Sequence, residues 1–202
     1  MILHSYPSSP YTRKVHIAIQ LLGFSDRVTV RNADVSDPAD QLRRDNPLGK
    51  VPALLLGNGT SVYDSPVILE YLDHLAGGGR IIPREPEERL AVLTLQALCD
   101  GALDACLLIY AESYYRTPEQ RVARWVDRHA GKVERALAAL EATTPALSGM
   151  PNVGQIALAC LLGYRDFRFD KTWRDTHPRL HAWHDAFAAA VPAFAASAPF
   201  DL

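Results

Sequence analysis

The sequence has few cysteines and no large excess of charge of either sign. Its 202 residues include three cysteines, Cys99, Cys106 and Cys160, outside any C-x-x-C or Cys/His ligand spacing. An odd number in helix-like apolar segments indicates neither a disulfide framework nor a zinc site, so we expect reduced core residues. The 21 Lys and Arg against 23 Asp and Glu give a formal net charge of -2. This balance leaves no basic excess to neutralise phosphates, so we expect no nucleic-acid partner.

Two further absences concern membranes and metals. The sequence has no run of about 18 uninterrupted apolar residues, and it starts with His, Ser and Pro where a signal peptide has a basic and then an apolar segment. Its seven His are scattered, without H-E-x-x-H or related spacing, so no metal site is expected. We expect a cytoplasmic protein without a membrane partner.

The first part of the chain alternates between strand-like and helix-like patterns. Apolar runs at residues 2–4, 28–30, 51–56 and 61–63 predict strands, and helical periodicity predicts helices at residues 11–22 and 65–76. Residues 34–46 are weakly helical, and Asn58-Gly59 indicates a hairpin turn between the last two strands. The predicted order is βαβ followed by ββα.

After the three glycines at residues 77–79, every long segment has helical period. The predicted helices cover residues 86–115, 118–142, 153–165 and 178–190. We therefore expect an α/β domain over residues 1–77, a linker over residues 78–85 and an all-helical bundle over residues 86–202.

The stretch SSPYTRKV, residues 8–15, opens the first predicted helix. A helix N-terminus presents unsatisfied N–H groups and the positive end of the peptide dipoles, which favour an anion such as a thiolate. Lowering a thiol pKa by about two units requires roughly 2.7 kcal/mol. A serine hydrogen bond to the charged sulfur supplies about 1.5 to 3 kcal/mol of this. The alternative is that Ser8 or Ser9 only caps the helix before Pro10.

Two other segments have features of a binding site for a peptide-like ligand. In NPLGKVPAL, residues 46–54, Pro52 is a candidate for a cis peptide that turns the backbone of Val51 outward, although it could equally end an edge strand. At the next helix start, Ser65 and free N–H groups would receive a carboxylate, and Asp64 an ammonium. Plain capping explains these two residues as well.

In this order and spacing, the three segments resemble the glutathione transferase family over essentially the whole chain. Ser9 falls where Ser-type members carry the thiol-activating residue, NPLGKVPAL resembles the segment that binds the glutathione backbone, and YDSPVILEYLD, residues 63–73, resembles the acidic residue and serine before the third helix. LLGYRDF, residues 161–167, and PRLHAW, residues 178–183, are similar to bacterial members. The resemblance implies a thioredoxin-like N-terminal domain, an all-helical C-terminal domain and a homodimer.

The resemblance also implies how glutathione would be held. The backbone of Val51 would pair with the cysteinyl group before cis-Pro52, and Lys50 would meet the glycyl carboxylate. Asp64 and Ser65 would hold the γ-glutamyl end. Glutathione would therefore be a substrate of the protein, and no metal is implied.

Catalysis would then depend on Ser9, which would stabilise the glutathione thiolate for attack on an electrophilic carbon of a small apolar substrate. Ser8 is the other hydroxyl that could have this role. Thiol-transferase activity is disfavoured because serine cannot form a mixed disulfide. The alternative function is a non-catalytic or regulatory binding module that kept the fold and lost turnover.

The first long helix of the second half carries further candidates. In relatives this helix lines the subunit interface, so the resemblance makes Asp100 and Asp104, four residues apart on one side of the helix, candidates for contact with the γ-glutamyl ammonium of glutathione bound to the partner subunit; simple solvation is the alternative for at least one. Tyr110 and Tyr114 are candidates for the second-substrate pocket, or equally core or rim residues without a function. Relatives open a later helix with Ser/Thr-x-x-Asp, where residues 152–155 read NVGQ. Because Asn caps well and Gln can reach back, we expect the reciprocal cap to persist.

Overall fold

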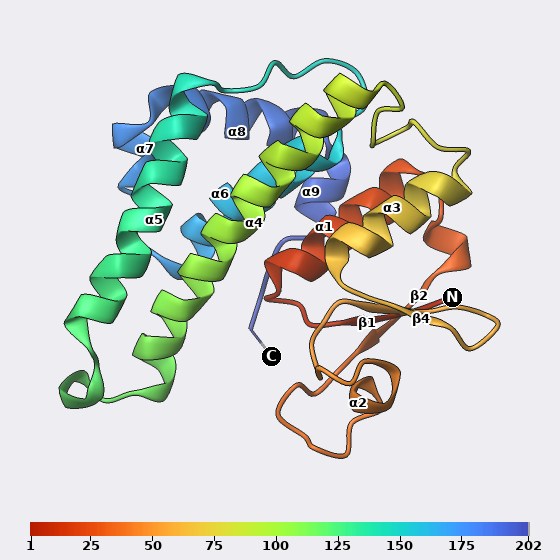
Figure 1. Ribbon diagram of the computed structural model, residues 1–202, viewed down its shortest axis with the longest axis horizontal. Coiled ribbons are helices and arrows are strands. Elements are labelled where there is room, and N and C mark those ends of the chain that lie inside the picture. The colour runs from red at the N-terminus through yellow and green to blue at the C-terminus, as the bar shows by residue number, and fades with distance from the viewer. Residues whose placement is uncertain (202) are drawn as a thin grey trace.

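The computed structural model describes residues 1–201, a four-stranded sheet followed by a helical bundle (Figure 1). The strands are β1 (Ile2–Ser5), β2 (Thr29–Asn32), β3 (Ala53–Leu55) and β4 (Ser61–Val62) in the order β2-β1-β3-β4. β1 pairs parallel with β2 and antiparallel with β3, and β3 pairs antiparallel with β4. This is the predicted thioredoxin-like βαβ-ββα arrangement. Leu202, the last residue of the expected helical domain, lies outside the described residues.

Three helices accompany the sheet: α1 (Pro10–Leu21), α2 (Leu42–Asp45) and α3 (Ser65–Leu75). Figure 1 shows α1 and α3 on the face of the sheet toward the helical bundle and α2 on the opposite face. The core between the sheet and helices α1 and α3 includes Leu3, Val15, Leu54, Ile68 and Leu72, all fully buried.

The weakly helical stretch at residues 34–46 forms only one helical turn, α2. Asp34, Asp37 and Asp40 bind nearby backbone N–H groups through their side chains and so form turns in place of helix. The strand predicted at residues 28–30 begins one residue later and ends at Asn32, because its pairing with β1 runs over the full length of that strand.

Asp73, in the last turn of α3, holds the connection to the helical bundle. Its carboxylate accepts hydrogen bonds from the backbone N–H groups of Gly79 (2.8 Å), Arg80 (2.8 Å) and Ile81 (2.7 Å). Asp73 and Ile81 are both buried, so the loss of their bond would leave the N–H of Ile81 as a buried donor without a partner. The linker is therefore an ordered part of the structure.

The helical half comprises α4 (Pro86–Tyr115), α5 (Ala123–Ala142), α6 (Val153–Arg168), α7 (Trp173–Thr176), α8 (Pro178–Ala190) and α9 (Pro192–Ala196). Its core lies where α4 packs on α5 and α6. Cys99, Cys106 and Cys160 are free thiols buried in this core. Burial raises the pKa of Cys106 and of Cys160 to about 11, so both thiols stay protonated at neutral pH, as expected for structural cysteines.

By length and composition alone, α4 could cross a membrane, since its 18-residue window has a mean hydropathy of 1.7. In this fold α4 is the central helix of the bundle, and its inner face packs on α5 and α6. Only 33% of the window is buried. Apolar side chains such as Leu98 and Leu108 consequently remain on the surface.

The helical half departs from the predicted boundaries at four places. α5 begins at Ala123 because residues 118–120 form a separate 3-10 turn, and α6 continues to Arg168. The short helices α7 and α9 were not predicted.

The reciprocal cap is confirmed: Asn152 accepts from the N–H of Gln155 at 3.0 Å, and the Gln155 side chain accepts from the N–H of Asn152 at 2.9 Å.

α1 joins the two halves of the molecule because it packs on α6 and α9. The guanidinium of Arg13 lies 3.7 Å from the centre of the Phe194 ring and donates to the Phe194 carbonyl at 2.8 Å. Gly163 of α6 makes room for it, since a Cβ atom there would lie 2.5 Å from Nη1 of Arg13. The position of α1 is therefore fixed by both halves.

Candidate functional site

The strand register brings the three sequence segments to one end of the sheet. His4 pairs with Ala53, and Leu54 pairs with Val62. The end of β1, the start of β3 and the end of β4 therefore lie side by side. Residues 6–9, 50–52 and 63–65 leave the sheet at this shared end, and two of the segments lead directly into helix N-termini.

Ser9 is the N-cap residue of α1, and its hydroxyl oxygen accepts from the backbone N–H of Thr12 at 3.3 Å. Because the oxygen is the acceptor, the O–H remains available to donate to a ligand. The first turn of α1 holds no acidic side chain, so no carboxylate offsets the positive end of its dipole there. Ser9 is half-buried and Ser8 is buried. Capping and donation to a ligand are therefore compatible at Ser9.

The loop before β3 is organised by Asn46, a buried residue. Its side-chain amide donates to the carbonyl of Lys50 at 2.8 Å, and its side-chain oxygen accepts from the N–H of Leu48 at 3.1 Å. The Val51–Pro52 peptide bond is cis, as expected, and sheet pairing starts only at residue 53. The backbone of Val51 thus lies outside the sheet ladder, and the Lys50 side chain is exposed beside it.

At the start of α3, Asp64 is the N-cap residue, but its side chain makes no capping hydrogen bond. The carboxylate of Asp64 is exposed, whereas Ser65 is buried, with only 2% of its surface exposed. The capping explanation left open by the sequence therefore does not apply to the side chain of Asp64. The first turn of this helix also lacks acidic residues, which leaves its N–H groups available to an anion.

Two side chains of α1 contact α4. Nζ of Lys14 lies 2.5 Å from a carboxylate oxygen of Asp100, and the Tyr11 hydroxyl donates to the carboxylate of Asp104. The Lys14 side chain is fully buried, and that of Asp100 is 17% exposed. Both aspartates thus bond to α1 of their own chain, and their contact with a partner subunit stays a prediction.

These contacts change the acid–base properties of the residues. Burial raises the pKa of Asp100, an effect that Lys14 opposes and that the charges of Asp104 and Asp64 increase. Burial and the hydrogen bond to Asp104 also raise the pKa of Tyr11, whose hydroxyl therefore stays a donor at neutral pH.

The sequence alone predicts no role for Lys14 or Tyr11. Lys14 lies on the same face of α1 as Ile17 and Ala18, which are fully buried. A cation on an apolar helix face requires a buried anion, so this spacing was a usable signal. The identity of the anion could not be found in the same way, because it depends on how α4 packs on α1.

The two tyrosines predicted for the second-substrate pocket lie together near the end of α4. The rings of Tyr110 and Tyr114 are stacked at 5.6 Å. Tyr110 is half-buried beneath the guanidinium of Arg168, 4.5 Å from its ring centre, while Tyr114 is 66% exposed. Arg168, at the end of α6, is a further residue of this region that the sequence analysis did not identify.

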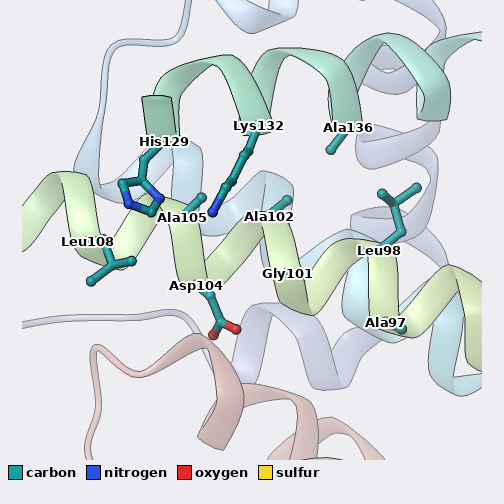
Figure 2. A pocket seen from close by; sticks show the side chains of 10 residues that line it. All are labelled: Ala97, Leu98, Gly101, Ala102, Asp104, Ala105, Leu108, His129, Lys132 and Ala136. Atoms are coloured by element: carbon teal, nitrogen blue, oxygen red, sulfur yellow. The ribbon is translucent and has the colours of Figure 1, made fainter. Parts of the chain in front are cut away.

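A separate cavity of about 410 Å³ lies between α4 and α5 (Figure 2). His129 and Lys132 point into it from α5, and most of the other lining side chains are small. Asp104 points away from α5 in Figure 2, in agreement with its hydrogen bond to Tyr11. The lining includes no residue of the three segments at the end of the sheet, so this cavity is distinct from the candidate site.

Metal binding finds no support in the geometry. Across residues 1–201, no group of three or more His, Cys, Asp or Glu side chains is placed to hold a metal ion.

Comparison with known proteins identifies the family. Residues 3–80 match the model of the glutathione S-transferase N-terminal domain, and residues 123–186 match that of the C-terminal domain. The "Uncharacterized GST-like protein YibF" of Escherichia coli (strain K12) is 33% identical over 167 residues, 80% of either chain.

Solved structures of a glutathione transferase family member from Pseudomonas fluorescens Pf-5 agree with this assignment. One contains bound glutathione, with 40% identity, a TM-score of 0.89 and 98% of both chains covered. Another contains S-(propanoic acid)-glutathione, with 39% identity, a TM-score of 0.87 and coverage of 99% of this chain and all of the other. The chain thus belongs to the glutathione S-transferase family.

Proposed function

We propose that the protein is a glutathione transferase that conjugates the glutathione thiolate to small electrophiles. The observation that carries the proposal is the Ser9 hydroxyl, free to donate at a helix N-terminus without a neutralising carboxylate. The glutathione in the Pseudomonas fluorescens relative supports the choice of ligand. Its sulfur would lie against Ser9.

The remaining segments would hold the two ends of the tripeptide. The free backbone of Val51 would pair with the cysteinyl group, and the exposed Lys50 would meet the glycyl carboxylate. Ser65 and the N-terminus of α3 would receive the γ-glutamyl carboxylate, and Asp64, which caps nothing, its ammonium. Opposite charges thus face each other along the ligand.

In the reaction, the thiol loses its proton to water and the thiolate attacks an electrophilic carbon. A carbon–sulfur bond forms, and a leaving group such as chloride departs with the electron pair of its bond. Tyr110 and Tyr114 would form part of the wall around the electrophile, since the half-buried ring of Tyr110 offers an apolar surface near the end of α4.

The experiment is conjugation of 1-chloro-2,4-dinitrobenzene by wild type, Ser9→Ala and Ser8→Ala, with glutathione binding measured separately by calorimetry. Ser9→Ala should lower kcat by about tenfold or more, since a hydrogen bond to a charged group contributes about 1.5 to 3 kcal/mol, while the Kd for glutathione changes little. Ser8→Ala is the matched control. Damage confined to Ser8→Ala would assign the role to the other hydroxyl, and binding without turnover over a broad panel of electrophiles would favour the non-catalytic module.

We further propose that the protein is a cytoplasmic homodimer, with the outer face of α4 and α5 at the subunit contact. Leu98, Leu108, Val122 and Trp125 leave apolar surface exposed along this face. Buried free thiols fit a reducing compartment. Light scattering should give twice the chain mass, and Leu108→Glu should give monomers; a monomeric wild type would refute the dimer.

A further inference from the structure

Arg168, at the end of α6, binds a carboxylate of its own chain. Its Nη1 and Nη2 atoms donate to the two carboxylate oxygens of Asp201 at 2.8 and 2.5 Å. Such a two-point geometry is the one by which arginine recognises carboxylates in ligands. The carboxylate belongs to the segment after α9, and Asp201 itself is 62% exposed.

The guanidinium is embedded, whereas its partner is not. Arg168 has a side-chain exposure of 11% and lies over the rings of Tyr110 (4.5 Å) and Phe167 (4.1 Å). Its Nε atom is buried and has no hydrogen-bond partner within residues 1–201. A preformed cation between aromatic faces is thus held in place by the protein, and the carboxylate on it is the replaceable component.

This cation contacts the same helix as the start of α1: Arg168 lies over Tyr110 of α4, and Tyr11 donates to Asp104 of α4. Arg168 is beside Tyr164 of the preceding helical turn, where it opposes the burial that raises the pKa of Tyr164 to about 12. The first turn of α1, which begins after Ser9, and the guanidinium of Arg168 therefore both contact α4.

The segment that carries Asp201 follows α9 and starts next to α1, the helix that begins after Ser9. α9 packs on α1 through Phe194 and Arg13, and Figure 1 shows the chain descending from α9 past the beginning of α1 in that view. The segment is therefore held at one end by α1 and at the other by Arg168. If the ion pair between Arg168 and the exposed Asp201 is broken, the end of the segment at Asp201 is released. The cores of the two domains are not part of this pair.

We propose that Arg168 determines specificity by binding a carboxylate of the second substrate, and that Asp201 occupies this position in the absence of the substrate. The inference rests on the proposed glutathione transferase function and names its substrate class: small electrophiles that carry a carboxylate. It is supported by the Pseudomonas fluorescens relative that holds S-(propanoic acid)-glutathione, an adduct with a carboxylate on the group attached to sulfur.

Binding of two glutathione adducts tests the proposal without turnover. S-(propanoic acid)-glutathione and S-propylglutathione share the tripeptide. The group on sulfur ends in a carboxylate in the first and in a methyl group in the second. Calorimetry at constant ionic strength should give a Kd for the acid about fivefold or more below that for the propyl adduct, as expected for one charge-assisted contact.

Two variants test the contributions of Arg168 and Asp201 separately, and Arg116→Gln is the control for the loss of a positive charge. Arg168→Gln should abolish the preference for the acid, so that the two adducts have nearly equal Kd values. Asp201→Asn, at an exposed position, should strengthen binding of the acid alone by roughly two- to fivefold, because the competing carboxylate is gone. The control arginine, half-exposed at the end of α4, should behave as wild type.

The same contrast extends to turnover of 4-chloro-3-nitrobenzoate and 4-chloro-3-nitrobenzamide, from which chloride leaves as the carbon–sulfur bond forms. Wild type should favour the benzoate in kcat/KM, and in Arg168→Gln the ratio of the two kcat/KM values should fall to about one. No preference for the acid in either wild type or Asp201→Asn would overturn the inference and leave the proposed function intact. Failure of wild type to bind either adduct would overturn the proposed function, and the inference with it.

Discussion

The pair formed by Lys14 and Asp100 gives a quantitative prediction about the contact between the two halves of the molecule. Replacement of Asp100 by Asn removes a charge with almost no change of volume and leaves the fully buried ammonium of Lys14 without its counter-ion. Breaking a buried ion pair costs about 3 to 5 kcal/mol. Because Asp100 retains 17% exposure, we expect a loss near the lower end, about 3 kcal/mol.

The chain offers a matched control at the surface. Arg89 and Glu70 are 2.6 Å apart, almost the same separation as in the buried pair, but Glu70 is 61% exposed. Exposed pairs contribute about 0 to 1 kcal/mol, so Glu70→Gln should have little effect. The comparison isolates burial, since each substitution neutralises one carboxylate.

Urea unfolding followed by circular dichroism and by tryptophan fluorescence measures both effects. Asp100→Asn should lower the unfolding midpoint strongly, and Glu70→Gln should barely move it. Addition of Lys14→Met to Asp100→Asn should recover most of the loss, since the buried charge is then gone. Equal small effects of Asp100→Asn and Glu70→Gln would refute the reasoning.

Three further substitutions probe other parts of the fold. Asp73→Asn should lower the free energy of unfolding by about 2 kcal/mol, because an amide cannot accept from all the linker N–H groups, and should speed proteolysis of the linker. Gly163→Ala should cost about 1 to 3 kcal/mol in urea unfolding, since its Cβ would lie 2.5 Å from Arg13. Burial lowers the pKa of His184 from 6.5 to about 4, so the unfolded chain takes up a proton there and stability should fall by about 3 kcal/mol between pH 6.5 and 4. His184→Gln should flatten that part of the pH profile.

Much of the fold follows from local sequence. Proline at the first turn and a capping side chain mark the starts of α1 and α4, and residues 152–155 keep a reciprocal cap in an unusual form. These signals act within one helical turn, so they can be recognised without knowledge of the packing. The short α7 and α9 lack a side-chain cap and a long apolar period, and tertiary contacts hold them.

The candidate site likewise has residues that local sequence indicates and residues whose partners depend on tertiary packing. Ser9, Pro52 and Ser65 could be named as candidates from the sequence because each lies at a helix or strand start with a recognisable pattern. The partners of Lys14 and Arg168 lie 86 and 33 residues away along the chain. Only the packing of α4 and the course of the segment after α9 bring them into contact, and no spacing in the sequence encodes that.

The central claim is that bound glutathione is held as a thiolate by Ser9. Ultraviolet difference absorbance of the saturated complex, titrated with pH, measures the pKa of the bound thiol directly. We predict a pKa about two units below the ordinary thiol value of about 8.5, and a return most of the way toward that value in Ser9→Ala but not in Ser8→Ala. A bound thiol that stays protonated at neutral pH, or a pKa that Ser9→Ala leaves unchanged, would contradict the account.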